Sequence, residues 1–105
     1  MKRYVAFALV ALITLLAAAL KLYIARTTYG TSDVWYWEVY LTTTRELGAI
    51  ALYHADEHFN HPPFTTHALL WLGALSDRTG LPFPFWLRVP AILADVVSVG
   101  LVATL

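Results

Sequence analysis

The sequence contains no cysteine, which excludes disulfide bonds, cysteine-ligated zinc and thiol catalysis. Charged residues are also scarce, at 13% of the chain, and the acidic and basic residues balance to a formal net charge of zero. A soluble domain carries about 25% charged residues, and a nucleic-acid-binding domain carries a basic surplus on one face. We therefore expect no nucleic-acid partner.

Glycine is too scattered to form the loops that hold phosphate groups. Apolar residues, by contrast, are abundant: they make up 59% of the chain, and the mean hydropathy is +0.61. Soluble proteins average about 45–50% apolar residues. The composition therefore predicts an all-α membrane protein, with about three transmembrane helices.

The first apolar segment predicts a transmembrane helix over residues 1–26. After Lys2 and Arg3, the run from Tyr4 to Leu20 contains Thr14 as its one small polar side chain. Extended through residue 25, the run has about 22 residues and a helical length of roughly 33 Å, which is enough to cross a bilayer. Lys21 would then lie near the far end and extend toward the headgroups. A cleaved signal peptide is the alternative, but its apolar core would be shorter, at about 7–15 residues.

Residues 27–61 form a polar, aromatic-rich insert, which holds five of the seven acidic residues and three of the four histidines. A helix cap at Thr31 or Ser32 starts a predicted amphipathic helix from Asp33 to Tyr53, suited to the plane of the membrane interface. Its apolar side consists of Tyr36, Tyr40, Leu47, Ile50 and Ala51. Asp33 projects onto that side, where the helix dipole is one explanation for a carboxylate and a functional role is the other.

Residues 62–105 predict the second and third membrane segments. Pro62 and Pro63 open the second, which is short for a span and could equally be re-entrant. The third follows Pro90 and contains Asp95, whose burial in lipid costs roughly 2.5–3.5 kcal/mol unless it faces a polar or protein environment.

Basic residues near the ends of the membrane segments predict the orientation, because they favour the cytoplasmic side. Lys2 and Arg3 precede the first segment, and Arg78 and Arg88 lie in or next to the second loop. We therefore expect the N-terminus and the second loop in the cytoplasm. The insert would be the first extracytoplasmic loop.

His54 to His58 matches the H-x-x-E-H pattern of one class of zinc peptidases. On a helix this spacing would place His54 and His58 one turn apart, where both could reach one metal ion. A third ligand has no obvious source, and prolines follow soon after. These histidines are therefore weak metal candidates, and a solvated polar loop is the competing interpretation.

The order of features resembles the N-terminal part of the GT-C superfamily of integral-membrane glycosyltransferases. The resemblance extends over essentially the whole chain and rests on short motifs: Gly30 to Tyr36 after the first helix, Asn60 to Phe64 with its proline pair, and Arg88 to Asp95. Members commonly have tyrosine before the proline pair, where this chain has His61. They transfer sugars from polyprenyl- or dolichyl-phosphate carriers, and they contain many more spans.

The resemblance implies that Asp33 is the catalytic base, or helps to bind a divalent metal ion in metal-dependent members. It implies inversion at the anomeric carbon, at the extracytoplasmic face of the plasma membrane or endoplasmic reticulum. The implied substrate-binding residues are Arg45, Asp56, Glu57, His58 and His61. The expected partners are the lipid-linked sugar, membrane lipids and further transmembrane helices.

Three functions follow from these observations. The first is glycosyl transfer, with residues 1–105 as a single N-terminal membrane portion that we expect to be inactive alone. The second is a non-catalytic small membrane protein, either an assembly partner or a truncated remnant. The third is a metal-dependent membrane hydrolase built on His54 and His58.

Overall fold

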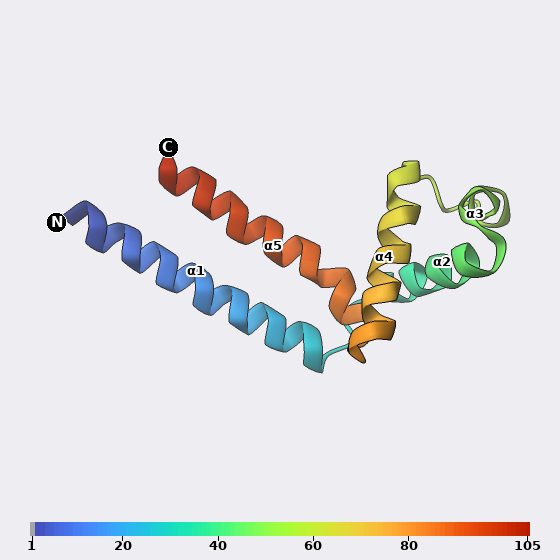
Figure 1. The fold of residues 1–105 in the computed structure, drawn as a ribbon, viewed down its shortest axis with the longest axis horizontal. Helices are drawn as coiled ribbons and strands as arrows, with labels where there is room; N and C mark the ends of the chain where they lie inside the picture. Colours follow the sequence, from blue (N-terminus) through green and yellow to red (C-terminus); the bar gives the residue numbers. More distant parts are fainter. Residues whose placement is uncertain (1) are drawn as a thin grey trace.

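The computed structural model describes residues 2–105, and this part of the chain is helical, with no strand (Figure 1). The all-α prediction is therefore confirmed. The helices in residues 2–105 are α1 (Lys2–Thr27), α2 (Asp33–Leu47), α3 (Ala49–Ala55), α4 (Pro63–Thr79) and α5 (Phe83–Thr104).

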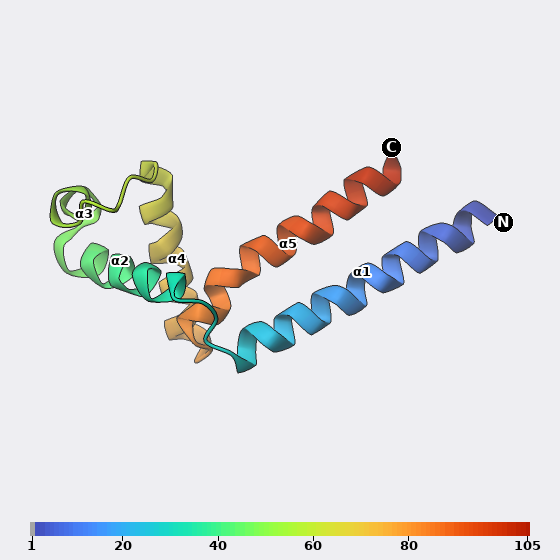
Figure 2. The same ribbon diagram turned by 180° about the vertical axis from the view of Figure 1, so that it is seen from behind.

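Helices α1 and α5 pack side by side and run antiparallel, and we call them the helix pair (Figures 1 and 2). They contain 26 and 22 residues, or about 39 Å and 33 Å of helix, against a hydrocarbon core of about 30 Å. Within residues 2–105, these two helices are long and apolar enough to cross a membrane. Most of their large apolar side chains are exposed. This surface suits association with a membrane.

Residues 28–82, which we call the head, all lie at one end of the helix pair (Figure 1). The buried cluster belongs to the head and to the first turn of α5. It consists of Tyr40, Leu41, Leu52, Phe59, Leu69 and Phe83. The head therefore has its own small core, and Phe83 joins that core to the helix pair.

The prediction of one continuous helix from Asp33 to Tyr53 was wrong, because Gly48 divides it. Gly48 has a φ of 92°, a region that glycine enters without steric cost, and its N–H donates to the Thr44 carbonyl at 2.9 Å. The chain then restarts as α3 in a new direction. As a result Leu52 is fully buried, while Leu47 and Ile50 are exposed, so the predicted apolar side is only partly correct.

Helix α4 runs crosswise to α1 and α5 in both views (Figures 1 and 2). It begins with Pro63 in its first turn and ends at Gly80, whose φ of 72° provides a left-handed C-cap. Because α5 starts where α4 ends, the turn at 80–82 lies at the same end of the helix pair as residues 28–32. The third span and the interfacial loop helix stay predictions.

Candidate functional site

Asp33, the predicted catalytic residue, is the first residue of α2 and is exposed to solvent. The first turn is set by backbone bonds from Val34 N–H to the Thr31 carbonyl, at 3.1 Å, and from Trp35 N–H to the Ser32 carbonyl, at 3.2 Å. Val34 is buried beside Asp33 and fixes the start of the helix. The carboxylate thus lies at the positive end of the α2 dipole, where a negative charge is favoured.

Arg88 of α5 lies against the turn that precedes Asp33. Its Nη1 donates to Thr28 Oγ1 at 3.0 Å and to the Ile24 carbonyl at 3.5 Å, so it caps the end of α1. Gly30, with a φ of 106°, allows this approach: a Cβ there would lie 2.0 Å from Arg88 Nη2. Nη2 is buried and has no hydrogen-bond partner within residues 2–105. Arg88 therefore ties the end of α1, the turn and the start of α5 together.

A second contact holds this loop against α2. The Tyr29 hydroxyl donates to Glu38 Oε2 at 2.7 Å. This hydrogen bond raises the pKa of the Tyr29 phenol, and partial burial and the negative charge of Glu38 act in the same direction. The loop between α1 and α2 is therefore fixed from both sides, by Arg88 and by Glu38.

His61, a predicted substrate-binding residue, belongs to the packing of the head. Its ring lies 4.9 Å from the ring of Trp37 and 5.3 Å from that of Phe59, measured between centroids. The Tyr53 hydroxyl donates to the His61 carbonyl oxygen. Nearby, burial raises the pKa of the Tyr40 phenol, with a smaller contribution from Asp56. His61 thus fixes the chain just before the proline pair.

The H-x-x-E-H segment is not one helix. Helix α3 ends at Ala55, so His54 lies in its last turn, while Glu57 and His58 lie in the turn that follows. Asp56 Oδ1 accepts the His58 N–H at 2.9 Å and lies 3.4 Å from His58 Nδ1. Across residues 2–105, no group of three or more His, Asp or Glu side chains is placed to hold a metal ion. The predicted helical spacing of the two histidines was therefore wrong.

Arg45 is engaged elsewhere. Its Nη2 donates to Asp77 Oδ2 of α4 at 2.8 Å, and its side chain passes over Gly73. Arg45 therefore links α2 to α4 through its ion pair with Asp77. Asp33 and Arg45 lie at opposite ends of α2, a helix of 15 residues, or about 22 Å.

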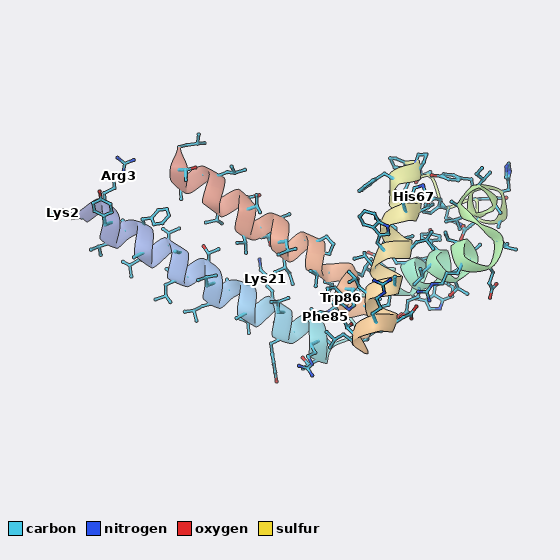
Figure 3. The ribbon with its side chains drawn as sticks, viewed as in Figure 1. Lys2, Arg3, Lys21, His67, Phe85 and Trp86 are labelled. Carbon is cyan, nitrogen blue, oxygen red and sulfur yellow. The ribbon has the colours of Figure 1, made fainter. Side chains whose placement is uncertain are left out.

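The structure also reveals an ion pair between α1 and α5. Lys21 Nζ lies 2.6 Å from Asp95 Oδ2, and Lys21 points from α1 toward α5 (Figure 3). Both residues line a hollow of about 220 Å³ between the two helices. Each charge was noticeable in the sequence, but no local pattern indicated that they would meet.

The site therefore divides into two groups. Asp33 lies with Gly30 and Arg88 at the end of the helix pair, whereas Asp56, Glu57 and His58 lie beyond α3 at the far end of the head (Figure 1). No known protein family, curated protein or solved structure matches the chain.

Proposed function

We propose that this chain is the N-terminal portion of a membrane glycosyltransferase and carries its catalytic base. It would transfer a sugar from a polyprenyl- or dolichyl-phosphate carrier to an acceptor at the extracytoplasmic face of the membrane, with inversion. One observation carries the proposal: Asp33 is an exposed carboxylate in a fixed turn at the end of a candidate membrane-spanning helix pair. A lipid-linked donor and a water-soluble acceptor would meet at such a boundary.

In this mechanism the acceptor hydroxyl loses its proton to the Asp33 carboxylate as its oxygen attacks the anomeric carbon. The bond from that carbon to the carrier's phosphate oxygen breaks, and the lipid phosphate leaves with the electron pair. A cation should meet the departing charge. Arg45 is already paired with Asp77, which weakens its predicted role. Arg88 would act as a positioning residue, since it holds the turn before Asp33.

The arrangement also supports a revised topology with two spans. If α1 and α5 both cross the membrane, the whole head lies on one side, and Arg78 cannot be cytoplasmic while Asp33 is outside. Residues 28–82 contain six acidic and two basic residues, whereas Lys2 and Arg3 directly precede the apolar part of α1. This distribution favours an extracytoplasmic head with the start of α1 in the cytoplasm.

The catalytic proposal is tested by Asp33→Asn introduced into the chromosomal gene. Membranes are supplied with radiolabelled polyprenyl-phosphate mannose or glucose, and incorporation into acceptor is measured. Loss of a general base costs about 10²–10⁴-fold in rate, so we expect transfer to fall by at least 100-fold at an unchanged protein level. Glu46→Gln, on the exposed surface at the other end of α2, is the matched control. Normal transfer by Asp33→Asn would overturn the proposal.

The topology is tested by cysteine labelling, because the chain has no cysteine of its own. Ser32→Cys and Arg78→Cys are placed singly in exposed positions and treated with a membrane-impermeant maleimide on intact cells. We expect both to be labelled from outside. Labelling of residue 32 alone would restore the three-span topology, and labelling of neither would place the head in the cytoplasm.

The hydrolase hypothesis has less support, because His54 and His58 do not share a helix and the residues around them form no candidate ligand set. A non-catalytic assembly partner needs only the helix pair and the head. Unaltered growth and transfer in the Asp33→Asn strain would favour that alternative.

A further inference from the structure

Helix α4 carries an apolar surface that faces away from the core of the head. Phe64, His67, Trp71 and Leu75 are spaced by three or four residues, so they share one side of the helix, and all four are exposed. Phe64 and Trp71 are 77% and 76% exposed, which is unusual for such large apolar side chains. We call these four residues the α4 stripe.

The opposite side of α4 makes the contacts with the rest of the head. Thr66, Leu69 and Gly73 are buried there, and Gly73 lies so close to Leu41 of α2 that a Cβ would meet that side chain at 2.9 Å. The α4 stripe therefore points away from α2. In both views α2 and α3 lie on one side of α4, and the helix pair extends away on the other (Figures 1 and 2). The stripe is thus turned toward the side occupied by the helix pair.

We infer that the α4 stripe lies in the interfacial layer of a phospholipid bilayer, with the helix pair inserted beside it. Because α4 runs crosswise to α1 and α5, it would lie along the membrane surface when these helices cross it. Its apolar side would then continue the lipid-facing surface of the pair. Aromatic side chains favour this layer, and His67, labelled on α4 in Figure 3, adds a polar ring to the stripe.

Charge at the end of α4 fits the same partner. Arg78 follows Leu75 by one turn and is exposed, so it can meet lipid phosphates while the aromatic residues lie deeper. Helix α2 fits this role less well, since its Tyr40 and Leu41 are buried in the head. The interfacial helix would thus be α4, whereas the sequence pattern suggested residues 33–53. This inference does not depend on glycosyl transfer.

The test uses single cysteines carrying a nitroxide spin label in the full chain, reconstituted in phosphatidylcholine–phosphatidylglycerol vesicles. Phe64→Cys and Trp71→Cys probe the stripe, while Ala55→Cys and Glu57→Cys are controls that are exposed at the far end of the head. The collision rates of each spin label with oxygen, which concentrates in lipid, and with a nickel chelate, which stays in water, are then measured. We expect the ratio of oxygen to nickel collisions to be several-fold higher at 64 and 71 than at 55 and 57.

Two results would overturn the inference. Equal ratios at positions 71 and 57 would show that the stripe is in water. Low collision rates with both reagents at position 71 would show that protein, rather than lipid, covers it. Trp71→Cys could lower the helical content, which circular dichroism would show. In that case the collision ratio at Phe64→Cys, at the exposed start of α4, tests the inference by itself.

Discussion

The head packs one cluster of its apolar side chains into a core, whereas the helix pair presents most of its apolar side chains outward. Five residues of the head, among them Leu52 and Phe59, form a buried cluster with Phe83 of α5, while α1 buries Ala25 alone along its described length. In water, burial of apolar surface stabilises the first arrangement. In lipid, apolar side chains gain nothing by leaving their surroundings. The two parts of one short chain therefore need different contacts to hold their shapes.

The polar contacts follow the same division. The helix pair is joined by Lys21–Asp95 and by the hydrogen bond from Arg88 to the Ile24 carbonyl of α1. The Arg45–Asp77 pair of the head is about as exposed as the Lys21–Asp95 pair, with side chains 41% and 66% exposed against 49% and 60%. In water such surface pairs stabilise a fold by about 0.2–1 kcal/mol, whereas a charge left unpaired in lipid is more costly. Polar contacts should therefore matter more in the helix pair than in the head, and apolar contacts should matter more in the head.

The largest effect on stability is expected from Leu52→Ala. Leu52 is fully buried, and truncation of such a side chain costs about 2–5 kcal/mol. Near-ultraviolet circular dichroism in detergent, followed during denaturation, should show earlier loss of aromatic packing in the head, with the far-ultraviolet signal of α1 and α5 retained. Leu47→Ala changes an exposed leucine and should cost about 0.5 kcal/mol or less. An equal loss of stability in Leu52→Ala and Leu47→Ala would contradict the buried core of the head.

A smaller effect is expected in the helix pair from Asp95→Leu, which leaves Lys21 without its partner. An unpaired charge in a membrane helix costs at most about 2.5–3.5 kcal/mol on insertion scales, and less where a lysine reaches the interface. Spin labels at Leu9→Cys and Leu101→Cys, measured in vesicles, should show a wider separation of α1 and α5. The double variant Lys21→Met, Asp95→Leu should restore the distance, because it leaves no charge unpaired. If the distance between the two labels is as large in the double variant as in Asp95→Leu, the ion pair does not hold α1 and α5 together.

The smallest effect is expected at Tyr29, in the loop that joins the two parts. Its pKa is raised above 10.0 by the hydrogen bond to Glu38. A raised pKa means that the folded protein holds this proton more tightly. The resulting stabilisation is fully present below pH 10 and is lost as the pH rises through the folded pKa. Phenolate absorbance, taken as the difference from Tyr29→Phe, should titrate at lower pH in Glu38→Gln. An unchanged titration would mean that the bond is absent in solution.

Much of this architecture follows from local sequence patterns. The apolar run after Arg3 predicts a long first helix, and the polar residues at 31–33 predict a helix start, which the structure places at Asp33. The proline pair likewise predicts the start of α4. These signals act over a few residues, where propensity and capping decide the outcome.

The remaining features depend on contacts that no local pattern contains. Gly48 was one of several scattered glycines, and no local pattern marked it as the one whose φ of 92° redirects the chain so that α3 buries Leu52. Lys21 and Asp95 are 74 residues apart, and Arg88 reaches Gly30 only because α1 and α5 pair. The candidate site shows the same limit: Asp33 was identifiable from sequence, but the neighbours that fix its turn were not.

The Lys21–Asp95 pair has a consequence for synthesis of the chain. Ribosomes add about 5–20 residues per second, so the 74 residues between the two partners take about 4–15 s to make. If α1 lies in a membrane during that time, the flexible side chain of Lys21 would extend toward the headgroups. Asp95 can pair with Lys21 only after this interval. The order of synthesis therefore predicts that the helix pair closes only after residues 28–82 have been made.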